Sequence, residues 1–167
     1  MHTSTNLASV RSSTLSHWMK VALQKGKQGV QRGERPFGAA IYRLTGEEVA
    51  VTCNTVFSTN NPAAHAEVNA ITQACQSLGK TKLSDCWLLA TAEPCPMCLS
   101  TAALAGIRFI AFGATQAVVK EAGYGDLGLT GREFAKQLTT DLILQGPVLG
   151  NECVSFLLNN RKRDQLG

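Results

Sequence analysis

One histidine, two cysteines and one glutamate stand in two short motifs that could together support metal chemistry. His65 is followed two residues later by Glu67, and two residues separate Cys95 from Cys98. An imidazole and two thiolates are typical zinc ligands. Three protein ligands leave a fourth position for water, as in catalytic zinc sites, whereas structural sites are closed by four. Glu67 would lie beside that water and carry protons without binding the metal. These residue types therefore predict a hydrolytic zinc enzyme.

Two helix starts are expected to position these side chains. An asparagine followed by a proline at positions 61–62 is typical of a helix start, so His65 would lie in or just after the first turn. Prolines on both sides of Cys95 indicate a second helix start, because proline is tolerated there. Cys95 and Cys98 would share one side of that turn. The helix dipole lowers thiol pKa values at this end, which favours thiolates as metal ligands.

The two motifs together resemble the signature of the zinc deaminases, H-x-E followed by P-C-x-x-C. Residues 65–67 read HAE and residues 94–98 read PCPMC. On these motifs the chain is similar to the cytidine deaminase-like superfamily, with the similarity extending from about Trp18 to about Leu158. The resemblance implies an α/β fold, namely a three-layer α/β/α sandwich with a mixed five-stranded sheet. It also implies a Zn²⁺ cofactor and hydrolytic removal of ammonia from an aminated base.

Further segments resemble the guanine deaminase branch of that superfamily. Asn54 stands eleven residues before His65, where the branch has an asparagine whose amide holds the base. Residues 36–39 resemble the entry to its first strand, so Phe37 is expected in the pocket wall as well as in the core. Residues 121–126 resemble a stretch whose last acid binds the base and relays protons, a role carried here to Asp126. The branch usually has an acid at the position of Gly125. The resemblance implies guanine as the substrate, with xanthine and ammonia as products.

Other substrates and another class of protein stay open. tRNA adenosine deaminases share both metal motifs, but they usually continue after their Phe-Gly strand with Asp-x-Lys-x-Gly-Ala, whereas residues 114–117 here are Ala-Thr-Gln-Ala. An RNA enzyme would also need a basic stripe, and only modest basic clusters are present. Guanosine, cytosine and the triazine ammeline are further possible substrates. A structural zinc module would need a fourth ligand, for which Cys86 or Cys75 are the candidates.

Length and composition limit the setting of this chemistry. The 167 residues suit a disordered leader over 1–12, a single deaminase domain over 13–160 and a basic tail over 161–167. No apolar run is long enough to span a membrane, and no hydrophobic signal region opens the chain. Six scattered cysteines suit the reducing cytoplasm. A small-molecule partner is expected rather than nucleic acid, and the family implies a homodimer that can exchange C-terminal segments.

Hydrophobic periodicity predicts an alternation of helices and strands around the two motifs. The expected helices span about 13–30, 62–78, 96–105, 116–121, 131–137 and 151–160, and the expected strands span 36–42, 49–57, 86–91, 107–113 and 139–144.

Overall fold

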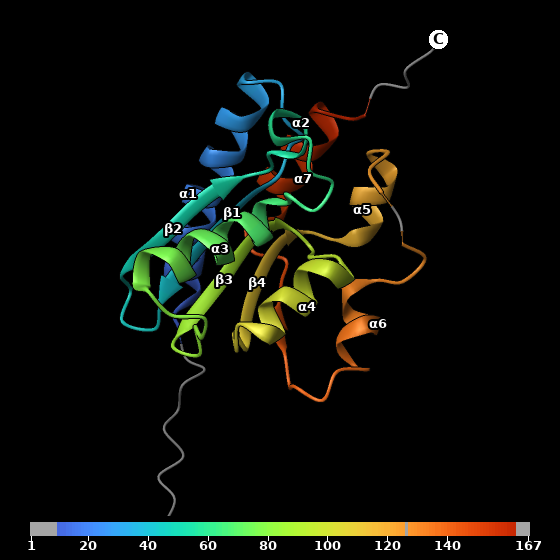
Figure 1. Cartoon of the computed structure of the whole chain (residues 1–167). Coiled ribbons are helices and arrows are strands. Elements are labelled where there is room, and N and C mark those ends of the chain that lie inside the picture. Colours follow the sequence, from blue (N-terminus) through green and yellow to red (C-terminus); the bar gives the residue numbers. More distant parts are fainter. Residues whose placement is uncertain (1–9, 126, 163–167) are drawn as a thin grey trace, which may run out of the picture.

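The computed structural model describes residues 10–125 and 127–162. Within these ranges, five strands form one sheet in the order β2-β1-β3-β4-β5. Strands β2, β1, β3 and β4 can be followed in that order in Figure 1. Strand β1 is antiparallel to β2 and β3, whereas β3, β4 and β5 run parallel to one another. The predicted mixed five-stranded sheet is therefore confirmed. The strands are β1 (Gly38–Arg43), β2 (Glu48–Cys53), β3 (Cys86–Ala92), β4 (Phe109–Ala114) and β5 (Ile143–Gln145).

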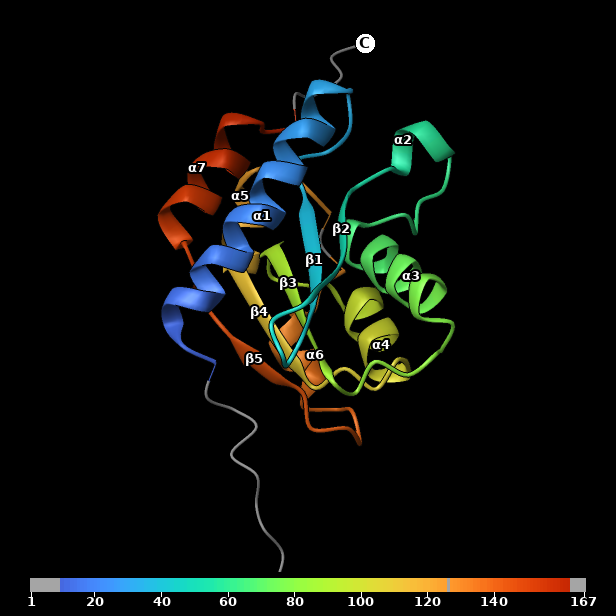
Figure 2. The same ribbon diagram turned by 90° about the vertical axis from the view of Figure 1, so that its left-hand side faces the viewer.

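Helices cover both faces of the sheet, as Figure 2 shows. One face packs against α1 (Ser12–Gln31), α5 (Gln116–Glu121) and α7 (Gly150–Asn159). The opposite face packs against α3 (Ala66–Leu78), α4 (Pro96–Leu104) and α6 (Gly131–Ala135). Successive residues of β1 point to alternate faces, so Ala40 and Tyr42 join the first core while Ala39 and Ile41 join the second. These layers confirm the α/β/α sandwich.

Helix α1 lies very close to the start of β1. A Cβ atom on Gly38 would lie 2.0 Å from the carbonyl oxygen of Ala22, so only glycine allows this approach. The amide of Gly38 donates to Oγ1 of Thr91 at 3.0 Å, which joins β1 to the end of β3. Farther along β1, the ring of Tyr42 stacks on the ring of Trp18 from α1, with centroids 4.6 Å apart. The contacts of Gly38 fix the end of β1 that borders the site described below, and the stack of Trp18 on Tyr42 holds the other end.

The segment between β2 and α3 differs from the sequence prediction. A short helix, α2 (Val56–Thr59), occupies residues expected to complete a strand and begin a loop. Helix α3 begins at Ala66 rather than at position 62. The reason is local: Oδ1 of Asn61 accepts a hydrogen bond from the amide of Ala63 at 3.0 Å, which forms an Asx turn instead of a helix cap. The strand expected from 49 to 57 accordingly ends at Cys53.

The last strand also differs: the pattern predicts it over 139–144, but β5 spans only Ile143–Gln145. The remaining boundaries agree within about two residues, and α5 spans the expected residues. In the described part of the chain, none of the helices combines the length and the apolar character needed to cross a bilayer. Most of the predicted leader and tail, residues 1–9 and 163–167, falls outside the described ranges.

Candidate active site

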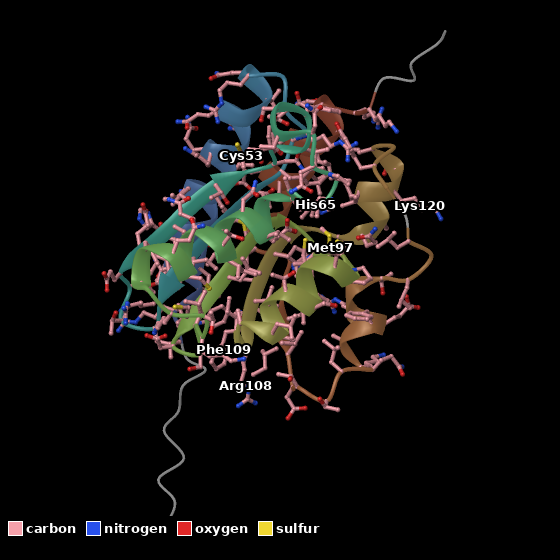
Figure 3. All side chains as sticks on the ribbon, in the orientation of Figure 1. Cys53, His65, Met97, Arg108, Phe109 and Lys120 are labelled. Atoms are coloured by element: carbon pink, nitrogen blue, oxygen red, sulfur yellow. The ribbon has the colours of Figure 1, made fainter. Side chains whose placement is uncertain are left out.

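The two motifs converge at the N-terminal ends of α3 and α4. His65 is the N-cap residue of α3, and Cys95 is the N-cap residue of α4, with Pro96 in the first turn of that helix. Cys98 follows in the same turn and is fully buried. Figure 3 shows His65 and Met97 on the same side of the molecule, where both line one cavity. The sequence thus places each metal-site side chain at a helix start, as expected, although His65 caps its helix rather than following the first turn.

The separation of the three ligand atoms tests whether a zinc ion fits. Nδ1 of His65 lies 3.6 Å from Sγ of Cys98 and 3.8 Å from Sγ of Cys95, and the two sulfurs are 3.6 Å apart. Around a tetrahedral zinc ion, with Zn–S of about 2.3 Å and Zn–N of about 2.0–2.1 Å, neighbouring ligand atoms lie roughly 3.6–3.8 Å apart. The donor set and its spacing therefore fit zinc without rearrangement.

The same cluster leaves one coordination position to a non-protein ligand. Among the described residues, only His65, Cys95 and Cys98 bring their ligand atoms within 4.8 Å of one another. Cys86, a candidate fourth ligand for a structural zinc module, has its thiol directed toward Asp85 instead. Cys75 lies in α3 and does not join the cluster either. The arrangement is that of an open site and not of a closed structural one.

Electrostatics distribute the protons of this cluster unequally when no metal is bound. A hydrogen bond from Cys98 and one from His65 lower the pKa of Cys95 to about 4, so this sulfur is a thiolate. The pKa of Cys98 is raised, first because it donates to Cys95 and second because it is buried. The hydrogen bond with Cys95 raises the pKa of His65. The two sulfurs beside a helix N-terminus thus carry one negative charge between them, and a divalent cation would displace the remaining thiol proton.

Glu67 lies in the first turn of α3, beside the metal ligands but outside their cluster. Its side chain is 8% exposed and lines the cavity. Burial raises its pKa to about 7 in the metal-free chain, and the negative charge of Cys95 adds to the rise. A buried carboxyl that can hold or release a proton near neutrality suits general acid–base work. Glu67 thus lies beside the metal ligands, and its role as proton carrier stays a prediction.

A cavity of about 300 Å³ opens beside the cluster. Asn54 is 1% exposed and contributes to its lining. Its Oδ1 accepts a hydrogen bond from the amide of Val56 at 3.0 Å, while the described residues accept no hydrogen bond from its Nδ2. The amide therefore presents mainly a donor to the cavity, where the sequence suggested a donor and an acceptor.

Two aromatic rings form one wall of the cavity. Phe37 and Tyr124 pack edge to face, with centroids 5.1 Å apart. The hydroxyl of Tyr124 donates to the carbonyl oxygen of Asn160, and the amide of Lys162 donates to the carbonyl oxygen of Ala122 at 2.9 Å. The segment after α7 thus holds the segment after α5 in place. Phe37 therefore has both expected positions, in the cavity wall and packed against the core.

Asp126, predicted as a substrate-binding and proton-relaying acid, lies outside the described residues. Its neighbours Gly125 and Leu127 do line the cavity. Several lining residues had no predicted role, because they reach the site from helices, a strand and loops that are far apart in sequence. They are Arg35, Pro62, Ala92, Glu93, Met97, Gln116, Val119, Tyr124 and Leu127. The sequence signal that could have identified Tyr124 and Leu127 is their position beside Asp126.

Comparison with known proteins gives matches to the same motif region. Residues 12–114 match the family described as the cytidine and deoxycytidylate deaminase zinc-binding region. The guanine deaminase of Bacillus subtilis is 40% identical over 110 residues, which cover 65% of this chain and 70% of that protein. The tRNA-specific adenosine deaminase of Aquifex aeolicus is 39% identical over 98 residues, which cover 59% of this chain and 64% of that protein.

A solved structure extends the likeness over most of the fold. The guanine deaminase from Nitrosomonas europaea superposes with a TM-score of 0.81 and 24% identity, over 87% of this chain and 84% of that one. At this identity the likeness concerns the fold alone. Taken with the matched motif region and a three-ligand cluster that fits the ion, it leads to one assignment: the chain belongs to the zinc deaminase family defined by the cytidine and deoxycytidylate deaminase zinc-binding region, and its cofactor is zinc.

Proposed function

We propose that the protein catalyses the hydrolytic deamination of guanine to xanthine and ammonia. The observation that supports the proposal is that Asn54 and Glu67 line the same cavity as His65 and Cys95, two of the three metal ligands. The Bacillus guanine deaminase, at 40% identity, supports the same substrate. Among the described lining residues, Arg35 is the sole arginine or lysine. A long RNA backbone would need several such residues to neutralise its phosphates, so RNA is disfavoured as the ligand.

In the proposed reaction each residue acts at a stated atom. His65 Nδ1 and the sulfurs of Cys95 and Cys98 would hold zinc, which supplies an activated water when bound. Nδ2 of Asn54 donates to an acceptor on the base and orients the ring. Glu67 takes one proton from the attacking water and delivers it to the ring nitrogen, then takes the second proton from the hydroxyl now bonded to the base carbon and delivers it to the departing amine. A carbon–oxygen bond forms and a carbon–nitrogen bond breaks, so water and base are consumed while ammonia leaves.

The walls of the cavity support this chemistry by excluding bulk solvent and by giving a planar base an apolar surface. Phe37 and Tyr124 pack edge to face and leave an apolar surface against which a planar base can pack. Asp126 is proposed, from the family resemblance, to bind the amidine edge and relay protons. Gly125 leaves open space at this point, since a Cβ there would meet no atom within 4 Å.

Adenosine in tRNA is the second candidate substrate, because the Aquifex tRNA-specific adenosine deaminase is 39% identical over the same region. Guanosine, cytosine and ammeline complete the set to be compared. The deciding experiment measures ammonia release from guanine, guanosine, cytosine, adenine, ammeline and an adenosine-bearing tRNA hairpin, with the zinc content determined on the same sample. We expect guanine to react fastest; turnover of the hairpin alone would refute the guanine proposal.

We also propose a homodimer in the cytoplasm. All six cysteines are free thiols, which suits a reducing compartment. Residues 160–162 lie against residues 122–124 of the same chain, so an exchange of C-terminal segments between protomers would place these contacts between subunits. Light scattering tests the dimer, and a monomer at working concentration would contradict it.

A further inference from the structure

One arginine at the cavity has no carboxylate partner among the residues that the structure describes. Arg35 is half-buried and is the sole cation among the described lining residues. None of the ion pairs formed within residues 10–125 and 127–162 involves it. A half-buried guanidinium without a counter-charge is a candidate anion-binding group, since its planar fork matches carboxylate and phosphate oxygens.

The acid next to Arg35 in sequence is committed elsewhere. The two carboxylate oxygens of Glu34 accept hydrogen bonds from the amides of Phe57 at 3.1 Å and Ser58 at 2.9 Å. Burial alone would raise the pKa of Glu34, but the bonds from Ser58 and Phe57 outweigh it and hold this pKa below the ordinary value. Glu34 therefore stays ionised and directed toward α2, and it does not neutralise Arg35.

The guanidinium of Arg35 is held in a defined place. Its central carbon lies 5.1 Å from the centroid of the Phe57 ring, which is 57% exposed. The carbonyl oxygen of Arg35 accepts a hydrogen bond from the amide of Phe37 at 2.8 Å, which fixes the backbone beside the cavity wall. Stacking uses the flat face of the guanidinium and leaves its N–H edge available to a ligand.

The charge of Arg35 also acts across the cavity. Burial raises the pKa of Tyr124, and the positive charge of Arg35 opposes that rise. By contrast, the inner lining contains the buried acids Glu67 and Glu93, 8% and 7% exposed, which would repel an anion. A neutral base suits the inner part, and a negative group suits the part near Arg35 and the exposed Phe57 ring.

We propose that Arg35 binds a phosphate that the substrate carries beyond its base, so that the site accepts a purine 5′-nucleotide. This inference rests on the proposed function and extends its substrate from the free base. A single cation matches one phosphate group, whereas RNA-binding surfaces neutralise several phosphates with many basic residues. The geometry therefore favours a mononucleotide over an RNA strand as the source of the phosphate.

A matched control separates this role from simple surface stacking. Arg132 also lies 5.1 Å from an aromatic centroid, that of Phe112, but it does not line the cavity. Arg132→Gln removes the same charge and the same kind of stack at a distant place. Arg35→Gln removes the proposed phosphate ligand, and Arg35→Lys keeps the charge but loses the planar fork.

The test uses the full-length, zinc-loaded Glu67→Gln variant, which is expected to bind without turnover. Calorimetry would compare guanosine 5′-monophosphate with guanosine, and repeat the comparison for the adenosine and cytidine pairs. We expect guanosine 5′-monophosphate to bind at least about tenfold more tightly than guanosine. Arg35→Gln should abolish this advantage, Arg35→Lys should keep part of it, and Arg132→Gln should keep all of it.

A further titration, with an RNA hairpin that presents the same bases in its loop, identifies the source of the phosphate. An advantage that depends on Arg35 for the hairpin but not for any mononucleotide would retain phosphate binding by Arg35 but overturn the mononucleotide as the source of the phosphate. The inference is overturned if no phosphate-bearing ligand gains affinity over its nucleoside, or if the gain survives Arg35→Gln. Ammonia release from guanine by the wild-type chain tests the proposed function separately, so the two failures can be distinguished.

Discussion

Sγ of Cys98 lies 3.6 Å from Nδ1 of His65, although 33 residues separate them in the chain. This distance results from two helix starts that meet at one end of the sheet, each with a ligand at its N-cap. Thr52 helps to hold one of them, because its Oγ1 donates to the carbonyl oxygen of Ala66 at 2.7 Å. The fold therefore brings together ligand atoms from two distant parts of the chain.

Zinc removal should abolish ammonia release and lower the melting temperature. A metal that binds the folded state and not the unfolded state stabilises the fold. Dialysis against a chelator should therefore remove both the activity and this stabilisation. Added Zn²⁺ should restore activity and stability, whereas Mg²⁺ should restore neither, because thiolates are poor ligands for it. Full activity in a sample shown by elemental analysis to lack zinc would contradict this expectation.

Asn54→Asp should separate the two functions of this side chain. The new carboxylate can still accept from the amide of Val56, as Oδ1 of Asn54 does at 3.0 Å, but it cannot donate to a base. We expect kcat/KM for guanine to fall by about 10- to 100-fold at unchanged zinc content. Unchanged kinetics would remove Asn54 from the substrate site. Asn54→Ala, which loses both bonds, should reduce stability as well.

Gly38→Ala should destabilise the fold strongly. Its Cβ would lie 2.0 Å from the carbonyl oxygen of Ala22, so α1 or β1 must shift, at a cost of about 2–3 kcal/mol. Gly125→Ala is the matched control, since a Cβ there meets nothing within 4 Å. Urea unfolding of both variants measures the difference. Equal stability of the two would show that the α1–β1 approach is less tight than the structure indicates.

The metal site could be predicted from sequence because its information is local. The spacings within residues 65–67 and 94–98, together with helix-start residues, determine which side chains share a turn. The three layers and the mixed five-stranded sheet followed from the element pattern and the family resemblance, whereas the strand order came from the structure. The start of α3 could not be predicted, since an asparagine followed by a proline suits both a helix cap and an Asx turn, and Asn61 adopts the turn.

The rest of the cavity depends on contacts between distant segments. Nδ2 of Asn69 donates to the carbonyl oxygen of Cys53 and to Oγ1 of Thr55, both at 2.9 Å, and so places the loop that carries Asn54. Nothing near Arg35 in sequence indicates that its guanidinium stacks on Phe57 and borders the cavity. Such tertiary bonds have no local signature, which is why these lining residues emerged only from the structure.

The central claim is that Glu67 moves protons beside a zinc ion that it does not bind. Glu67→Gln keeps the size of the side chain and removes its acid–base function. Zinc content and ammonia release, measured on the same preparation with guanine, test this directly. We expect one zinc per chain, as in the wild type, and a loss of kcat of at least about 100-fold. Retention of activity within a few-fold, or loss of the zinc, would contradict the claim.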